Sequence, residues 1–125
     1  MPTILIVEDD EDNRLLLKML LESWNYCVIE AEDGIEALKS AEKASPDLIL
    51  MDVRIPLLDG LEAARQIRQS ATICRIPIIF ISGCAEPKYR AAARAIGANA
   101  YLTKPFDFDQ LQSVIAEQVK FSYIH

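Results

Sequence analysis

The sequence lacks features that several common classes of protein require. No apolar run approaches the roughly 18 residues of a membrane-spanning helix, and no basic region precedes the short apolar run near the N-terminus, as a signal peptide requires. Lys and Arg number 13 against 19 Asp and Glu, so the net charge is −6. That balance argues against direct binding to nucleic acid, which depends on clusters of basic side chains. We therefore expect a cytoplasmic protein with no membrane insertion and no direct nucleic-acid partner.

Cysteine and histidine are also scarce. The three cysteines, Cys27, Cys74 and Cys84, form no CxxC pair and are odd in number. This pattern favours reduced thiols over a disulfide framework. The single histidine is the terminal His125, for which we expect no role.

Apolar runs and helix-like segments alternate five times along the 125 residues. The candidate strands are continuous apolar runs, as expected where helices cover both faces of a parallel sheet, at 3–7, 26–31, 48–51, 76–81 and 100–103. The helix-like segments lie at 13–24, 34–44, 60–69, 88–97 and 108–119. A length typical of one domain and 51% hydrophobic residues predict a single α/β domain over residues 1–125.

Several residues indicate where helices begin and end. Asp33, Asp59 and Asp107 each stand three residues before a Glu or Gln, an Asp form of the capping box. Each such cap contributes about 1 kcal/mol. Asn25 and Gly97 follow helix-like segments and tolerate the left-handed conformation in which many helices terminate.

Carboxylates follow two of the candidate strands directly. Residues 3–7 lead into Glu8 and Asp9, and residues 48–51 lead into Asp52. If these two strands are neighbours, the carboxylates meet at the edge of the sheet where ligands of parallel α/β proteins bind. Two carboxylates about 4 Å apart repel by roughly 4 kcal/mol at an effective dielectric constant of 20. Such a cluster needs protons or a cation, and Mg²⁺ suits it because protein sites hold this ion through one or two carboxylates, water and phosphate.

The same edge of the sheet receives a hydroxyl and an ammonium group. Ser82 follows the fourth candidate strand, and Lys104 follows the fifth. An acidic metal pocket flanked by these two groups is typical of phosphoryl chemistry. The alternative for the acids after the first strand is that they are solvated residues at a helix start, where the helix dipole favours them. We favour this alternative for Asp10 and Asp12.

Four segments resemble the signature segments of the receiver domains of two-component response regulators, including the single-domain, CheY-like chemotaxis type. They are ILIVEDDEDNR, DLILMDVRIPLLDG, IPIIFISG and AYLTKPFD, in the family's order and at suitable spacing. The resemblance covers essentially the whole chain. It implies a flavodoxin-like, doubly wound (βα)5 fold whose five parallel strands lie in the order 2-1-3-4-5.

The resemblance also implies roles for the charged residues. Asp52 would accept a phosphoryl group, forming an acyl phosphate. Asp9 would bind Mg²⁺, or Mn²⁺ in its place, directly, and Glu8 would assist through water. Asp52 and the main-chain carbonyl of Arg54 would be further ligands. Lys104 would pair first with the acceptor carboxylate and then with the phosphoryl oxygens.

A switch is implied by the same resemblance. Ser82 would hydrogen-bond the phosphoryl group, and Tyr101 would respond by moving between exposed and buried rotamers. The Lys104–Pro105 bond resembles the family's cis peptide.

Arg54 and Cys84 lie two residues beyond the acceptor and the switch hydroxyl, at positions that vary in the family. In the family, these two positions also border the path of the water that hydrolyses the acyl phosphate. We hypothesise that Arg54 lengthens the lifetime of the phosphorylated form by impeding that water. The alternative is a solvent-facing arginine without kinetic effect.

Because the chain has no credible internal phosphohistidine, the resemblance implies a sensor histidine kinase or a histidine phosphotransfer protein as donor. The first helix should dock this donor through its exposed edge. We expect most of its apolar set to be buried in the core: Leu15, Leu16, Met19 and Leu20. Segments 88–97, 100–103 and 108–119 resemble the family's output surface. A downstream protein target or a homodimer is expected there.

We expect a signalling module and not a multiple-turnover enzyme, with two alternatives. A hydrolase using Asp52 as its nucleophile usually needs a carboxylate two residues further on as general acid, where this chain has Arg54. A phosphorylation-independent scaffold is the other alternative. Retention of the acids, Ser82 and Lys104 argues against it.

Overall fold

Five strands and five helices alternate along the chain in the computed structural model, which describes the backbone of residues 1–124 and the side chains of residues 1–119. The strands are β1 (Thr3–Val7), β2 (Cys27–Ala31), β3 (Leu48–Met51), β4 (Ile78–Ser82) and β5 (Ala100–Thr103). The helices are α1 (Glu11–Ser23), α2 (Gly34–Ala44), α3 (Gly60–Gln69), α4 (Pro87–Ile96) and α5 (Phe108–Ile124). His125 lies outside the described residues.

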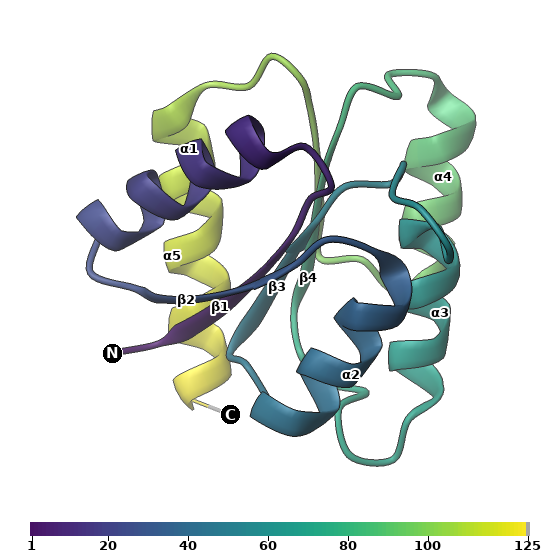
Figure 1. Ribbon diagram of the computed structural model, residues 1–125, viewed down its shortest axis with the longest axis horizontal. Helices are drawn as coiled ribbons and strands as arrows, with labels where there is room; N and C mark the ends of the chain where they lie inside the picture. The colour runs from purple at the N-terminus through teal and green to yellow at the C-terminus, as the bar shows by residue number, and fades with distance from the viewer. Residues whose placement is uncertain (125) are drawn as a thin grey trace.

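The strands form one parallel sheet in the order β2-β1-β3-β4-β5, which confirms the expected topology. Helices α1 and α5 cover one face of the sheet, and α2, α3 and α4 cover the other (Figure 1). The strand order reverses at β1, which pairs with both β2 and β3. The carboxyl ends of β1 and β3 therefore lie side by side, as the site prediction requires. No helix in the described part of the chain has the length and apolar character needed to cross a bilayer.

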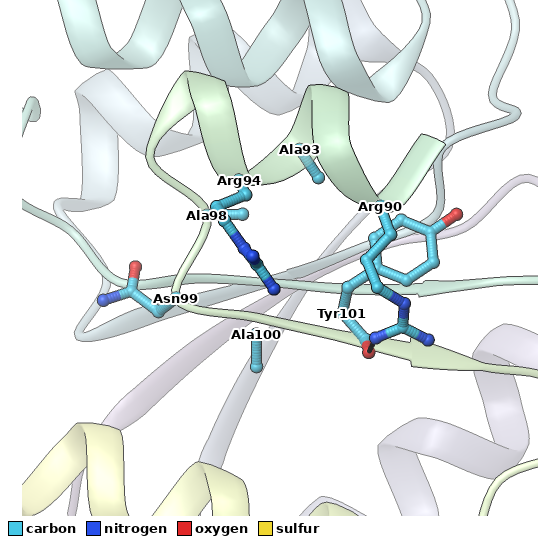
Figure 2. Close-up of a pocket in the computed structure, with 7 residues that line it drawn as sticks. All are labelled: Arg90, Ala93, Arg94, Ala98, Asn99, Ala100 and Tyr101. Carbon is cyan, nitrogen blue, oxygen red and sulfur yellow. Dashed lines mark hydrogen bonds between the residues drawn. The ribbon is translucent and has the colours of Figure 1, made fainter. Parts of the chain in front are cut away.

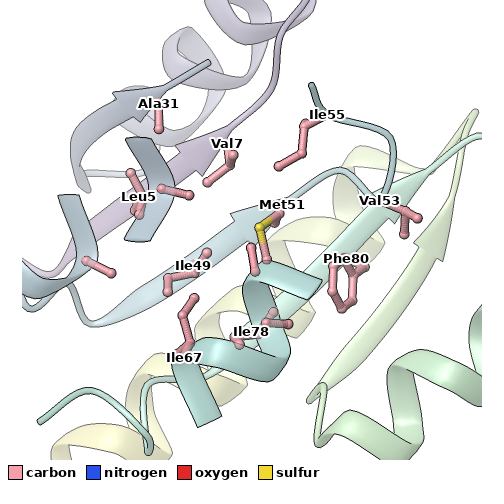
Figure 3. Packing of buried hydrophobic residues seen from close by; sticks show 14 of the residues in the cluster. Leu5, Val7, Ala31, Ile49, Met51, Val53, Ile55, Ile67, Ile78 and Phe80 are labelled. Atoms are coloured by element: carbon pink, nitrogen blue, oxygen red, sulfur yellow. The ribbon is translucent and has the colours of Figure 1, made fainter. Parts of the chain in front are cut away.

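The continuous apolar runs are explained by burial on both faces of the sheet. Alternate strand residues, such as Leu5, Ile49 and Phe80, pack beneath α2, α3 and α4 (Figure 3). Their neighbours, such as Leu50 and Ile79, pack with residues of α1 and α5. Every residue of β3 and β4 is buried, so neither strand has a solvent-facing side. Polar and apolar residues therefore do not alternate along them.

The expected helix ends are confirmed. Each of the three aspartates accepts a hydrogen bond from a first-turn N–H group: Asp33 from Glu36 at 2.7 Å, Asp59 from Glu62 at 2.9 Å and Asp107 from Asp109 at 2.7 Å. Asp10 caps α1 in the same way, so it is a helix-start residue as we favoured. Asn25 and Gly97 have φ angles of 69° and 99°, in the left-handed region. The three cysteines are free.

The orientation of α1 corrects one prediction. Leu17 and Leu21, one turn apart, are the residues that this helix buries in the core. The residues expected to be mostly buried are instead largely outside it: Leu15, Leu16 and Met19 are 52%, 46% and 60% exposed, and Leu20 is half-buried. Helix α1 carries apolar side chains on several of its sides. Its packing on the sheet buries only the narrow stripe that contains Leu17 and Leu21. We call the exposed residues Leu15, Leu16 and Met19 the α1 apolar edge.

Candidate functional site

Three charged side chains meet at the carboxyl ends of β1, β3 and β5. The Nζ of Lys104 donates a hydrogen bond to Oε1 of Glu8 at 2.9 Å and to Oδ2 of Asp52 at 2.8 Å. The three residues are far apart in the sequence and follow three different strands. The parallel topology therefore assembles the charged cluster that the strand-end pattern predicted. The Lys104–Pro105 bond is cis, as expected.

The charges in this cluster are not fully balanced. Only 4% of the Glu8 side chain is exposed, and its burial raises its pKa despite the opposing hydrogen bond and charge of Lys104. Burial by itself would lower the pKa of Lys104, but the hydrogen bonds and charges of Asp52 and Glu8 outweigh it and raise that pKa. Lys104 is thus held as a cation, while one ammonium group serves two carboxylates. The cluster therefore sets two carboxyl groups against one ammonium group.

Asp52 lies at the edge of the hydrophobic core, with one side of its side chain exposed to solvent. Its Oδ1 accepts a hydrogen bond from the backbone N–H of Arg54 at 3.0 Å, and 13% of its side chain is exposed. Gly60 passes so close that a Cβ atom there would collide with the main-chain oxygen of Asp52. The exposed side of Asp52 opens into a cavity of about 460 Å³ that Arg54, Ser82 and the 83–86 loop also line.

The carboxyl oxygens near the end of β1 and at the end of β3, those of Glu8, Asp9 and Asp52, are the ones available to hold a divalent cation. Asp9 follows Glu8 directly and is exposed, and the second oxygen of Glu8 accepts a hydrogen bond from the N–H of Asp10 at 3.3 Å. Within the part of the chain that the structure describes, no three His, Cys, Asp or Glu side chains form a ready-made metal cage. Mg²⁺ is commonly held by one or two carboxylates with water and phosphate at its other positions, so this arrangement suits it.

A hydrogen-bonded chain leads from the cavity to β5. Ser82 is fully buried, and its Oγ accepts a hydrogen bond from the N–H of Cys84 at 3.1 Å. The carbonyl oxygen of Cys84 accepts one from the hydroxyl of Tyr101 at 2.6 Å. Tyr101 is only 8% exposed and packs against Phe80, and burial raises the pKa of its hydroxyl. The two residues predicted to form a switch are therefore joined through the backbone of Cys84.

Arg54 extends towards residues that the sequence did not connect with it. Its side chain is exposed, and its pKa is raised first by hydrogen bonding to Tyr89 and then by Cys84. Arg54, in the loop after β3, thus lies near Tyr89 of α4 and near Cys84, and it lines the same cavity as Asp52. The sequence analysis did not identify Tyr89 as a neighbour of Arg54, because its sequence context indicates only that it belongs to a helix.

Glu8→Gln is expected to increase stability at neutral pH. Because the pKa of Glu8 is raised on folding, its contribution to stability is fully present below its unfolded pKa and is lost as pH rises through the folded value. Glutamine has no charge to bury, so the advantage of the variant should be absent near about pH 4 and grow towards neutrality. Urea denaturation at both pH values measures it, with the exposed Glu22→Gln as control. A variant less stable than the parent protein at neutral pH would contradict the assignment.

Comparisons with known proteins agree with this geometry. A family model described as "Response regulator receiver domain" matches residues 4–116. The chain is 44% identical over 103 residues to the alkaline phosphatase synthesis transcriptional regulatory protein PhoP of Bacillus subtilis, covering 82% of this chain and 42% of that protein. It is 41% identical over 117 residues to the CAI-1 autoinducer sensor kinase/phosphatase CqsS of Vibrio cholerae, covering 93% of this chain and 17% of that protein. The chain thus spans less than half of either relative.

Solved structures show the same fold. The receiver domain of the sensor histidine kinase PA1611 from Pseudomonas aeruginosa superposes with a TM-score of 0.88 and 39% identity, covering 95% of this chain and 98% of that one. That structure has a magnesium ion coordinated in its active-site cleft. Given the family match, the strand order and the cluster of Glu8, Asp52 and Lys104, the chain belongs to the response regulator receiver domains of two-component systems.

Proposed function

We propose that the chain accepts a phosphoryl group on Asp52 from the phosphohistidine of a sensor kinase or a histidine phosphotransfer protein, and that this modification switches a binding surface. One observation carries the proposal: a single ammonium group bridges two carboxylates, one of which opens into a cavity. This arrangement presents an anionic oxygen to an incoming phosphorus atom and a cation to the phosphoryl oxygens. Such positioning and charge compensation are what phosphoryl transfer requires.

In the proposed transfer, a carboxylate oxygen of Asp52 forms a bond to phosphorus as the P–N bond of the donor breaks. The electron pair of that bond goes to the imidazole nitrogen, which takes up a proton from solvent. Lys104 neutralises charge on the phosphoryl oxygens as they approach. The product is an acyl phosphate, a mixed anhydride suited to a transient signal.

Mg²⁺, or Mn²⁺ with the same ligands, fits a pocket in which two carboxyl groups share one ammonium group. The raised pKa of Glu8 indicates that Lys104 alone does not compensate the buried carboxylates, and the phosphoryl group adds further negative charge. Glu8, Asp9, Asp52 and the main-chain carbonyl of Arg54 are the proposed ligands. When bound, the ion supplies charge neutralisation at the phosphoryl oxygens.

The α1 apolar edge is the proposed docking site for the donor protein. Beside it lies a mainly apolar cavity of about 330 Å³, whose lining includes Leu16, Phe106 and Phe108 and also Glu8 and Lys104. Phe108 is 46% exposed. A donor helix that placed an apolar face here would have its histidine next to the acceptor, in the common helix-in-groove mode of recognition.

The proposed switch uses the chain of contacts through Cys84. A hydrogen bond from Ser82 to the phosphoryl group would draw the loop after β4 towards Asp52, and Tyr101 is bound to the same loop. Phosphorylation would then change the surface of α4, β5 and α5, where we propose that a downstream target or a second copy binds. Phosphorylation acts here by shifting the population of two arrangements.

Phosphoramidate labelling tests the proposal. The protein is incubated with this small donor and MgCl₂, and its intact mass and the release of inorganic phosphate are followed. We expect one phosphoryl group per chain when MgCl₂ is present, and no labelling when EDTA replaces MgCl₂ from the start. Continuous phosphate release far beyond one equivalent would indicate a hydrolase, and absence of labelling would indicate a phosphorylation-independent scaffold.

Arg54→Ala is expected to shorten the half-life of the phosphorylated protein by about two- to tenfold, which corresponds to about 0.4 to 1.4 kcal/mol of activation free energy. In the proposal, the guanidinium group lies between solvent and the acyl phosphate and impedes the hydrolytic water. Decay of the labelled protein measures the effect, and Arg54→Asn tests whether a short polar side chain suffices. The exposed Arg75→Ala is the charge-matched control. Equal half-lives for all four proteins would remove this role for Arg54.

A further inference from the structure

Arg14 lies at the end of the first turn of α1, close to the acids that follow β1. Its side chain is only 12% exposed, which is unusual for an arginine. Nη1 of its guanidinium group donates a hydrogen bond to the carbonyl oxygen of Glu8 at 3.0 Å. Nothing in the proposed phosphoryl transfer uses this residue, so its burial beside the acids needs another explanation.

Each nitrogen of this guanidinium group has a different partner. Besides the bond from Nη1, Nε donates to Oε1 of Glu30 at 3.2 Å, and Nη2 lies 3.2 Å from Oε1 of Glu32. Glu30 belongs to β2, and Glu32 follows that strand. Because the guanidinium group is planar and its N–H groups form a rigid fork, partners in three directions fix its orientation. The carbonyl oxygen of Glu8 is thereby joined to β2 and its loop through a rigid group.

The backbone of Glu8 is held on both sides. Its N–H group donates to the carbonyl oxygen of Ala31 at 3.1 Å, and its carbonyl oxygen accepts the bond from Arg14. A peptide group is planar, so fixing the oxygen of Glu8 also fixes the direction in which the chain continues to the Cα of Asp9. Arg14 thus influences the placement of both carboxylates near the end of β1 through the backbone that joins them.

We propose that Arg14 is a positioning residue for the divalent cation. It holds the peptide group between Glu8 and Asp9 so that their two carboxylates can serve one ion. The inference rests on the proposed function, in which these acids bind Mg²⁺. Groups that orient metal ligands without touching the ion commonly change metal affinity by about 10- to 100-fold when they are removed.

The charge of Arg14 by itself predicts the opposite effect on metal binding. A positive charge near the site repels Mg²⁺, so its removal would tighten binding if charge alone mattered. Removal would also leave Glu30 and Glu32 without this partner and so increase the attraction for the ion. The sign of the change in Mg²⁺ affinity therefore separates positioning from charge.

Two other arginines also bond to backbone carbonyl oxygens, but away from these acids. Arg90 donates to the carbonyl oxygen of Tyr101 at 2.9 Å (Figure 2). Arg68 is half-buried and donates to carbonyl oxygens near the amino ends of β4 and β5, including that of Gly97 at 2.9 Å. Because the strands are parallel, these amino ends lie at the edge of the sheet opposite to Glu8. Arg68→Ala is therefore a matched control, since it removes a hydrogen-bonded guanidinium group far from the acids.

Titration of the unphosphorylated protein with MgCl₂ tests the proposal, with Kd taken from the NMR shifts of the backbone amides of residues 8–10. We expect R14A to weaken Mg²⁺ binding at least about tenfold. R14K keeps the charge but has one nitrogen in place of the fork, so it should weaken binding at least about threefold. K18A removes a cation that pairs with the same Glu30 at 3.8 Å. Both K18A and R68A should stay within about twofold of the parent protein.

Two further measurements separate positioning from a general loss of stability. In the metal-free protein, the ¹⁵N order parameter of the Asp9 amide should fall from about 0.85, typical of rigid backbone, towards about 0.6 in R14A but not in R68A. In labelling with phosphoramidate, R14A should need about tenfold more MgCl₂ for half the maximal rate. Its rate at saturating MgCl₂ should stay within about twofold of that of the parent protein.

Several outcomes would overturn the role of Arg14. They are R14A binding Mg²⁺ as tightly as the parent protein or more tightly, equal weakening by R14A and R68A, and an Asp9 amide equally ordered in the parent protein and R14A. R14K as tight as the parent protein would overturn the need for the fork. A parent protein that binds no Mg²⁺ would refute both the metal site and this inference. Weaker binding by R14A in a protein that is never labelled would refute the proposed function and leave the positioning role standing.

Discussion

Asp52→Asn is expected to abolish phosphoryl incorporation, with less than about one-hundredth of the parent labelling rate remaining. An amide has no anionic oxygen with which to attack phosphorus. Asparagine has the same shape, and its oxygen can still accept the hydrogen bond that Arg54 N–H donates to Asp52. Loss of activity would therefore not be due to loss of the fold. Intact mass after incubation with phosphoramidate and MgCl₂ measures the effect.

The matched control for this variant is Asp12→Asn, which makes the same charge change in the first turn of α1. It should label as the parent protein does. The Asp52→Asn variant should also lower the pKa of Glu8, because the charge of Asp52 is one of the causes that raise it. Labelling of Asp52→Asn at the parent rate would show that the phosphoryl group is attached elsewhere.

Lys104→Met is expected to slow labelling by about 100-fold or more, the size of effect seen when one group that stabilises transition-state charge is removed. The ammonium group is the only cation hydrogen-bonded to Asp52 among the described side chains. Methionine keeps much of the volume of the lysine stem and removes the charge. The initial rate of labelling at saturating MgCl₂ measures the loss.

Removal of Lys104 should also alter the pH dependence of stability. Its raised pKa means that its contribution is fully present below the unfolded pKa and is lost only as pH rises through the folded value, in strongly alkaline solution. In the variant, Glu8 loses the partner that had opposed the effect of burial, so its pKa should rise further. The exposed Lys43→Met on α2 is the control. A Lys104→Met protein that labels at the parent rate would contradict the proposed role of the ammonium group.

Much of the fold could be predicted from the sequence because its strands are buried on both faces. Continuous apolar runs marked all five strands, and aspartates marked the helix starts, since both signals are local. The strand-end pattern likewise placed Glu8, Asp52 and Lys104 at one edge before any contact was known.

Other features depend on contacts between distant segments. Helix α1 is apolar on several sides, so its sequence could not show that Leu17 and Leu21 face the core and that Leu15 does not. Two further contacts join distant segments through side chains that no sequence pattern distinguishes. Arg54 lies near Tyr89, and Arg90 packs over the ring of Tyr101. Packing decides such contacts, and a single sequence does not reveal it.

The most direct test of the account is to locate the phosphoryl group within the chain. Protein labelled with phosphoramidate and Mg²⁺ is reduced with borohydride, which converts an aspartyl phosphate to homoserine, and its peptides are analysed by mass spectrometry. The account predicts homoserine at position 52 and at no other position. Modification at Glu8 or Asp9 with Asp52 unchanged, or no modified residue in protein kept with its donor and metal, would contradict it.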